Sequence, residues 1–252
     1  MIKFFRKIRY KLMSENKTGK YFKYAIGEIV LVVIGILIAL SINNWNEERK
    51  KRIQGKKYVV EIYNDLNSDL LSLNRILSKL EINKTTSRQI LEILESEDKY
   101  IADSSLFVSN VLNTNAVIDV RRNNRTWDEL RSSGQIAMIE NDSLNELLSG
   151  FYGYFDKQVY QFSETPAKIR KQNRTISARC KDLSSVNRYW KEGGDKSYNK
   201  SWFNCFIDNP EVKMNINSVH VSTYWQIHHF TFIKEKGQSI INYLNKTTTL
   251  ND

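Results

Sequence analysis

Histidine, cysteine and neighbouring acidic residues are the side chains that could support chemistry in this 252-residue sequence. The three histidines, His220, His228 and His229, fall on one predicted helix, and about 12 Å of helix axis separates the first two. One metal ion cannot join side chains that far apart without ligands from elsewhere, so we expect no metal centre. Asp128 and Glu129 point to different faces of a helix, which favours solvent or cap positions over a general acid and base.

The sequence also lacks the usual catalytic motifs. It contains no Gly-x-Ser-x-Gly, no Gly-x-x-x-x-Gly-Lys, no His-Glu-x-x-His and no Cys-x-x-Cys. We therefore expect a protein that is not an enzyme and binds no cofactor. Cys180 and Cys205 are predicted either to form a disulfide, whose loop closure would stabilise the fold by about 3.5 kcal/mol, or to be two separate buried thiols.

The net charge of +10 is concentrated at one end of the chain. Residues 1–57 hold 14 of the 38 basic residues and 4 of the 28 acidic ones, and the remaining chain is neutral. Nucleic-acid binding would need a basic face on the folded domain, so we expect no nucleic-acid partner. Basic residues around an apolar segment are instead typical of membrane proteins.

That apolar segment, residues 25–42, contains one charged residue and covers about 27 Å as a helix. With aromatic residues at both ends, it predicts a transmembrane helix over 21–45, continued by a solvated stalk over 46–58. The long domain that follows is expected in the periplasm and the N-terminus in the cytoplasm, at the inner membrane of a bacterium. A cleaved signal peptide is the alternative, but Glu28 and the long basic region before the apolar run favour an uncleaved anchor.

Small residues and one carboxylate mark the predicted anchor. Gly27, Gly35 and Ala39 lie on similar faces, and Gly35-x-x-x-Ala39 would let a second helix approach closely, although small apolar residues are common in membrane helices. Glu28 either sits at the interface beside a cation or takes part in coupling across the membrane. Residues 1–20 are predicted to form a basic amphipathic helix on the bilayer surface, the alternative being a disordered tail.

The low counts of proline and glycine, 2 and 10, predict an all-α fold. We expect a helical bundle over 59–246, beginning with a heptad helix whose apolar stripe alternates in steps of four and three. A kink or turn is expected near 83–86, where the stripe becomes polar, and the pattern over 98–124 is too blurred to assign. The members of this stripe are Val59, Tyr63, Leu66, Leu70, Leu73, Leu77 and Leu80.

Cap and stop residues predict the later helices. Thr126 would cap a short helix that Gly134 ends, and Asn141 or Asp142 would cap another with an aromatic stripe packed in the core. Thr165-Pro166 either starts a further helix or kinks that one, and Asn209-Pro210-Glu211 starts the last helix. We expect an irregular, aromatic-packed excursion near 183–206 and a frayed tail over 247–252.

Two blocks of residues resemble a known family. Residues 1–52 are similar to the opening of a family of single-pass membrane proteins of Bacteroidota that is described only as domain of unknown function six-zero-nine-zero. A second block, which continues with Met138-Ile139-Glu140-Asn141, resembles that family's central Glu-Leu-x-Ser-Ser-Gly segment. It includes Trp127, Glu129, Leu130, Ser132, Ser133 and Gly134. Gln135-Ile136-Ala137 departs from the usual apolar residues. The resemblance implies an anchored helical domain and assigns no reaction.

Three hypotheses follow. The first is a membrane-anchored helical scaffold whose partners are the lipid bilayer and either another protein or a second copy of the chain. The second is a sensor or ion-coupled accessory subunit of a larger membrane complex that uses Glu28. The third, an enzyme acting through the excursion at 183–206, would require polar groups converging on a cleft.

Overall fold

The computed structural model describes residues 10, 18–123, 125–181 and 198–247. The chain divides into two compact units, Met1–Lys57 and Tyr58–Asp252, which are described separately here. Most of the predicted amphipathic segment, most of the excursion and the tail after Thr247 lie outside the described residues.

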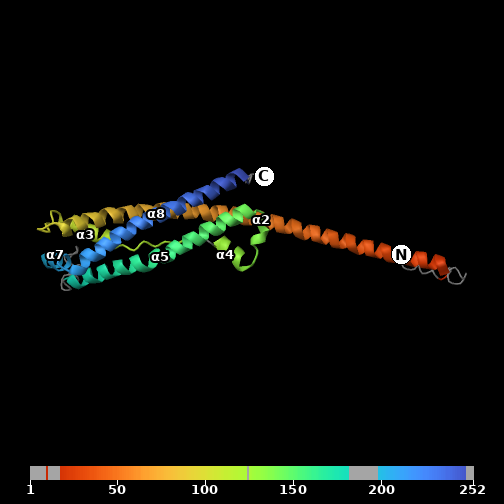
Figure 1. The fold of residues 1–252 in the computed structure, drawn as a ribbon, viewed down its shortest axis with the longest axis horizontal. Helices are drawn as coiled ribbons and strands as arrows, with labels where there is room; N and C mark the ends of the chain where they lie inside the picture. Colours follow the sequence, from red (N-terminus) through yellow and green to blue (C-terminus); the bar gives the residue numbers. More distant parts are fainter. Residues whose placement is uncertain (1–9, 11–17, 124, 182–197, 248–252) are drawn as a thin grey trace, which may run out of the picture. The chain divides into compact units, whose positions relative to one another are not determined.

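The described chain is helical and contains no strand, so the predicted all-α fold is confirmed. The α-helices are labelled in Figure 1. In chain order the elements are α2 (Thr18–Glu95), α3 (Ser104–Thr114), α4 (Arg125–Ser132), the short 3₁₀ helix η1 (Ile136–Met138), α5 (Asp142–Cys180), α7 (Lys200–Ile207) and α8 (Pro210–Thr247). The predicted transmembrane and stalk segments form one uninterrupted helix, because α2 runs through both.

The first unit is the N-terminal part of α2. Its apolar stretch has a mean hydropathy of 2.8 and is the one described helix segment that is long and apolar enough to cross a membrane. Its apolar side chains are exposed: Leu31, Ile36 and Ile42, for example, keep 63%, 55% and 60% of their surface accessible. Twelve large apolar side chains exposed between residues 25 and 42 require an apolar solvent or a partner helix.

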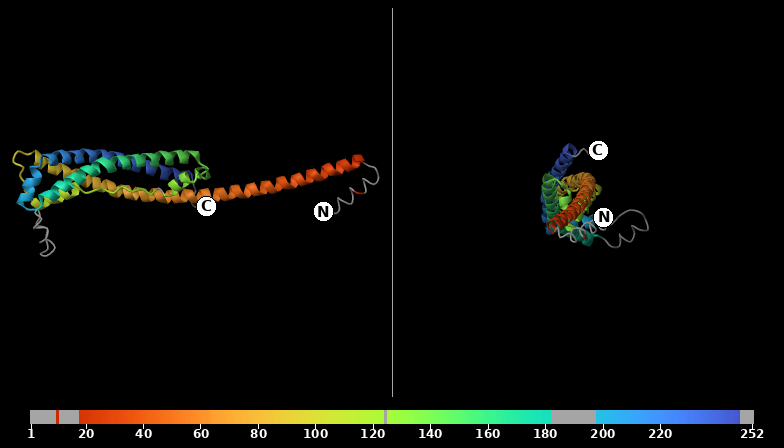
Figure 2. Two further views of the ribbon diagram at one scale, coloured as in Figure 1. Left: turned by 90° about the horizontal axis from the view of Figure 1, so that it is seen from below. Right: turned by 90° about the vertical axis from the view of Figure 1, so that its right-hand side faces the viewer.

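The second unit is a bundle in which α5, α8 and the later part of α2 lie side by side along their length (Figures 1 and 2). Two apolar clusters fill it. One joins α2, α4, α5 and α8 around Trp127, Tyr152 and Phe155, and the other joins the end of α2 to α3, α5, α7 and the start of α8 around Trp202 and Phe206. Each of these five side chains is no more than 2% exposed. Large aromatic side chains packed between helices therefore lie at the centre of both clusters, surrounded by leucine, isoleucine and valine.

The buried face of α2 differs from the predicted stripe in two ways. Tyr58, Ile62 and Ile76 lie in the core, whereas the predicted Val59, Tyr63 and Leu77 lie at its edge. The other four predicted members are buried as expected: Leu66, Leu70, Leu73 and Leu80. The expected break near 83–86 is absent. Asn83 and Ser87 continue the same four-three spacing between Leu80 and Ile90, and all four are buried.

Hydrogen bonds explain why the polar turn of α2 stays helical. The Thr86 hydroxyl donates to the Ile82 carbonyl at 2.9 Å and accepts from the Thr114 hydroxyl of α3 at 2.9 Å. The Ser87 hydroxyl lies 2.9 Å from Nδ1 of His220 on α8. Because the hydroxyls of Thr86 and Ser87 find partners within the bundle, burying them does not require the helix to end.

The short helix α4 ends as predicted but begins differently. Gly134 has a φ of +69°, and the amides of Gly134 and Gln135 donate to the carbonyls of Arg131 and Leu130, which is the Schellman arrangement. Thr126 is not the cap. It lies inside α4, and its backbone N–H donates at 3.3 Å to Oδ2 of Asp65 on α2, so the N-terminal turn is capped from a distant helix.

The remaining helix starts follow their sequence signals. Asn141 caps α5 by accepting from the Leu144 amide at 2.9 Å, and the Asn209 side chain accepts from the Glu211 amide at the start of α8. The helix α5 continues through Pro166 without ending, so Thr165-Pro166 starts no new helix. The aromatic stripe of α5 packs in the core as expected, with Phe151, Tyr152 and Phe155 buried.

The predicted irregular excursion is partly wrong, because residues 200–207 form α7. Trp202 and Phe206 on α7 are fully buried against each other and against α3. Cys180, the last residue of α5, and Cys205 on α7 form a disulfide, which is one of the two predicted alternatives. The disulfide joins the ends of the segment 181–204 and ties α7 to α5.

Candidate functional site

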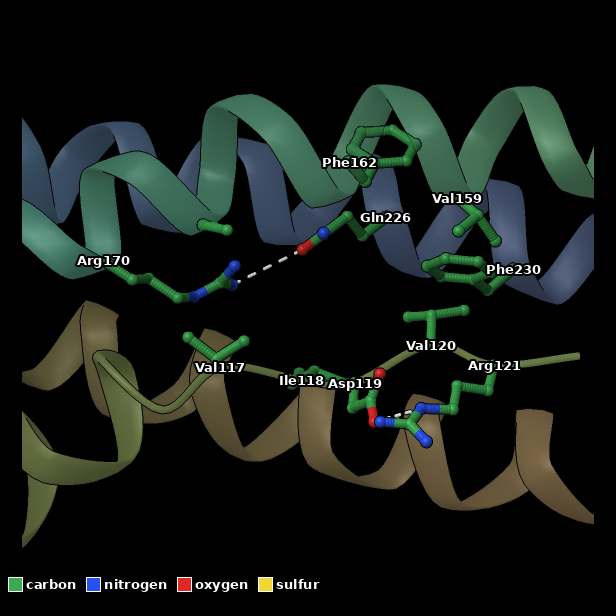
Figure 3. Close-up of a pocket in the computed structure, with 11 residues that line it drawn as sticks. Val117, Ile118, Asp119, Val120, Arg121, Val159, Phe162, Arg170, Gln226 and Phe230 are labelled. Carbon is green, nitrogen blue, oxygen red and sulfur yellow. Dashed lines mark hydrogen bonds and ion pairs between the residues drawn. The ribbon is translucent and has the colours of Figure 1, made fainter.

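An extended segment between α3 and α4, residues 116–123, brings the polar groups of the bundle together. We call it the strap. Figure 3 shows it running between α2 on one side and α5 with α8 on the other. Ile118 and Val120 are half-buried against the core. The strap has no helical hydrogen bonds of its own, so side chains must hold it in place.

Arg122 and Asn123 fasten the end of the strap. The Arg122 guanidinium donates to both carboxylate oxygens of Asp156 on α5, at 2.5 and 2.7 Å, and lies 3.6 Å from Asp128 on α4. It also stacks over the ring of Tyr152, 5.0 Å from its centroid. The Arg122 side chain is 10% exposed and that of Asp156 is 48% exposed, so this is a bidentate ion pair between a largely buried cation and a carboxylate that still faces solvent.

The carboxylate of Asp69 on α2 also holds the end of the strap, by accepting a hydrogen bond from it. Its Oδ1 accepts from the backbone N–H of Asn123 at 2.5 Å, while the Asn123 side chain donates to Ser68 at 2.6 Å. Burial raises the pKa of Asp69 to about 7, although the Asn123 amide and Arg122 favour its charged form. Asp69 is therefore a buried carboxyl group that changes charge near neutral pH.

A cavity of about 250 Å³ lies beside the middle of the strap, among α5, α8 and the strap itself. Its walls are mainly apolar and come from all three (Figure 3): Val117 and Val120 on the strap, Val159 and Phe162 on α5, and Phe230 on α8. Val117 keeps 49% of its surface exposed, so the cavity meets solvent beside the strap.

Arg170 of α5 is the buried cation of this cavity. Its side chain is 3% exposed, and Figure 3 shows it extending from α5 into the space above the strap. One terminal nitrogen, Nη2, donates to the Thr223 hydroxyl at 3.1 Å and to Oε1 of Gln226 at 3.4 Å, both on α8. Its Nε is buried and finds no hydrogen-bond acceptor among the described residues.

No described carboxylate forms an ion pair with Arg170. Asp119 is the acidic residue among those that line the cavity, and it pairs with Arg121 at 2.7 Å. Both side chains point away from α5 in Figure 3. Burial alone lowers the pKa of Arg170 to about 10, which leaves the guanidinium charged at neutral pH. The cavity thus combines apolar walls with one cation that lacks an anion.

A second feature of the bundle is the outward side of α5 and α8. Two open grooves of about 790 and 820 Å³ follow it, lined in part by Leu147 and Phe232 and by Val221 and Trp225. These four side chains keep between 39% and 52% of their surface exposed. Solvent-facing aromatic and aliphatic residues along two helices are typical of a contact surface.

The residues predicted to pack or couple within a membrane all lie in the exposed part of α2. A Cβ added to Gly27 or Gly35 would meet nothing within 4 Å, so neither glycine is needed for packing inside this chain. Ala39 is exposed, and Glu28 is half-buried and has a partner within the structure. These four residues belong to the first unit, whereas the strap and the cavity belong to the second.

The family-like segment supports the fold rather than forming a polar site. Trp127 and Leu130 are buried in the core, Gly134 ends α4, and the hydroxyls of Ser132 and Ser133 donate to the carbonyl of Glu129 at 3.2 and 2.7 Å. The histidines lie on α8 as expected, with Nδ1 of His229 2.7 Å from the Tyr154 hydroxyl. The described residues hold no cluster suited to a metal ion.

The sequence interpretation missed Asp69, Arg122 and Arg170. One signal was available for Arg170: it continues the apolar spacing of α5 by two turns beyond Phe162, so a charged residue stands where the stripe predicts a core position. No comparable signal existed for Arg122, because its partners are distant in sequence and the apolar residues of its own segment follow no regular spacing.

Comparison with known proteins gives a family but no function. A family described as "Family of unknown function (DUF6090)" matches residues 28–187, which include the apolar end of α2, the strap and α5. No curated protein and no solved structure matches the chain. The match covers more than half of the sequence and agrees with the resemblance seen in the central segment. The chain therefore belongs to the family of unknown function DUF6090.

Proposed function

We propose that this protein is a membrane-anchored interaction protein of the bacterial envelope. The anchor would be residues 21–45, and the helical bundle would stand in the periplasm with the N-terminus in the cytoplasm. The observation that carries the proposal is the continuous exposure of the apolar residues over 25–42, in a helix that also supplies one member of the bundle. Exposed side chains of this number and size are stable only in lipid or against another apolar helix.

Two further observations support the proposed placement. Six basic residues between Arg49 and Lys57 follow the apolar stretch and eight precede it, as expected for a segment with charged ends at two membrane surfaces. The disulfide between Cys180 and Cys205 belongs to an oxidising compartment such as the periplasm.

The proposed partner is a second copy of the chain. Gly35 and Ala39 are spaced for close approach of two membrane helices, and the space beside Gly35 is empty within one chain. Two copies paired through this face would keep their bundles in the same membrane plane. The bundle carries equal numbers of acidic and basic residues after position 57, so repulsion between copies is weak.

In-cell cross-linking tests this proposal. Single cysteines are placed at Gly35 and, as a control on another face, at Leu37, in full-length chains carrying a C-terminal tag. Recovery in the membrane fraction, with the tag cleaved by protease only from the periplasmic side, is expected for both. Cross-linked dimers are expected at position 35 and much fewer at 37. Recovery in the soluble fraction would contradict the anchor, and cross-links only to a different protein would contradict self-association.

A further inference from the structure

We propose that the cavity beside the strap binds a small organic monoanion, a carboxylate with a compact apolar body, whose carboxylate pairs with Arg170. This goes beyond the proposed anchoring and self-association and does not rest on either. The ligand class follows from three properties of the cavity, namely its cation, its walls and its size.

The cation selects one negative charge. Arg170 is almost fully buried, and its Nε has no described acceptor, so a donor remains for an anion that enters the cavity. Thr223 and Gln226 already engage Nη2, which fixes the orientation of the guanidinium before any ligand arrives. The other basic residue on the wall, Arg121, is paired with Asp119, so the cavity neutralises one charge and disfavours a dianion.

The walls select an apolar body. Two valines of the strap face Phe162, Val159 and Phe230 across the cavity (Figure 3), and the charged residues of the strap, Asp119 and Arg121, pair with each other. An inorganic anion such as sulfate would meet Arg170 but leave the apolar walls uncovered. A carboxylate attached to a ring or a short chain covers both.

The size limits that body. A 150 Å³ cavity lined by apolar residues accommodates benzene, so 250 Å³ holds a molecule of about ten non-hydrogen atoms. Phenylpropanoate and hexanoate fall in this range, whereas a long-chain fatty acid does not. The ligand is therefore a small carboxylate rather than a membrane lipid.

Calorimetric titration of the full-length protein in lipid nanodiscs, with empty nanodiscs as the baseline, tests the proposal. The probes are phenylpropanoate, hexanoate, their neutral amides, and sulfate. We expect both carboxylates to bind and each to bind at least ten times more tightly than its amide or sulfate, because the charge-assisted hydrogen bonds to Arg170 need the anion and the walls need the apolar body.

Three variants assign the binding to Arg170. Arg170→Met removes the cation at similar volume and is expected to weaken carboxylate binding about 10- to 100-fold. Gln226→Glu places a protein carboxylate against the same guanidinium and is expected to do the same, which keeps the test available if the methionine variant fails to fold. Arg174→Met removes an exposed guanidinium from α5 that does not line the cavity, and it is expected to leave binding unchanged.

Several results would overturn the proposal. These are no binding heat with either carboxylate at millimolar concentration, equal binding of an acid and its amide, sulfate binding as tightly as the carboxylates, or an Arg174→Met effect as large as that of Arg170→Met. Failure of the chain to self-associate or to enter the membrane fraction would leave the cavity inference standing.

Discussion

Arg122 at the end of the strap and Arg170 beside its middle are both largely buried, and their surroundings differ. Arg122 is held by two oxygens of Asp156, approaches Asp128 and stacks on Tyr152. Arg170 is more deeply buried, yet its side-chain hydrogen bonds among the described residues go to the neutral side chains of Thr223 and Gln226. A cation whose charge is matched within the chain is a structural fastening. A cation left unmatched beside a cavity costs stability, which a bound anion can return.

The largest expected effect on the free energy of unfolding comes from removing Arg122, the arginine whose charge is matched within the chain. Arg122→Met removes the bidentate pair and the contact with the Tyr152 ring, and since Asp156 and Asp128 are about half exposed, we expect a loss of about 2–3 kcal/mol in the free energy of unfolding. Denaturant unfolding at pH 8 measures it. Arg121→Met is the control, because Arg121 and Asp119 keep 86% and 67% of their side-chain surface exposed and their pair contributes little. Equal losses in the two variants would show that burial does not distinguish these pairs.

The next effect concerns Asp69, the other fastening of the strap. Its pKa is raised from 3.8 to about 7 in the folded protein, so the folded state binds the proton more tightly than the unfolded state. The free energy of unfolding of the wild type is therefore not reduced by Asp69 below pH 3.8, where the carboxyl group is protonated in both states. It falls as the pH rises, until the folded carboxyl group has lost its proton above about pH 7. Asp69→Asn should therefore be more stable than the wild type at pH 8, by about 2 kcal/mol, and equal to it near pH 3.

Unfolding curves of the two proteins from pH 3 to pH 9 test this expectation. Asp65→Asn is a useful comparison, because Asp65 is half-buried and accepts the Thr126 amide of α4. A difference between Asp69→Asn and wild type that does not change with pH would show that Asp69 keeps one protonation state throughout.

A smaller effect is expected from giving Arg170 a partner. Gln226→Glu replaces the amide that accepts from Nη2 with a carboxylate of the same shape, which makes Arg170 resemble Arg122. We expect a gain of about 1 kcal/mol, measured by denaturant unfolding at pH 7. The matched control is Gln158→Glu on α5, because Gln158 is also buried but its Oε1 has no donor among the described residues. A carboxylate at this position would be buried without a cation, so the change should destabilise the protein.

The smallest effect is expected from removing the unmatched arginine. Arg170→Met loses two hydrogen bonds, but it also removes the cost of burying an unpaired guanidinium, so the free energy of unfolding without ligand should change by less than about 1 kcal/mol. Thermal unfolding with and without phenylpropanoate would separate this from binding. A loss as large as that of Arg122→Met would contradict the contrast between the two arginines.

Local signals predicted much of the helical layout. The caps Asn141 and Asn209, the stop at Gly134 and the scarcity of glycine and proline each act within a few residues, so they can be read in sequence order. Where prediction was wrong, a distant partner decided the outcome. The polar turn of α2 stays helical because Thr114 and His220 bond to it, and residues 200–207 are helical with Trp202 buried against α3 and Cys205 bonded to α5.

By itself, the sequence determined the helical class, the apolar segment, the starts of α5 and α8 and the end of α4, because these depend on the backbone preferences and periodicity of neighbouring residues. Only the tertiary structure decided the site. Asp69, Arg122 and Asp156 lie on three elements separated by more than thirty residues, and Arg170 reaches Gln226 across 56 positions. Burial determines whether each charge is matched or left unmatched, and burial depends on the packing of the whole bundle.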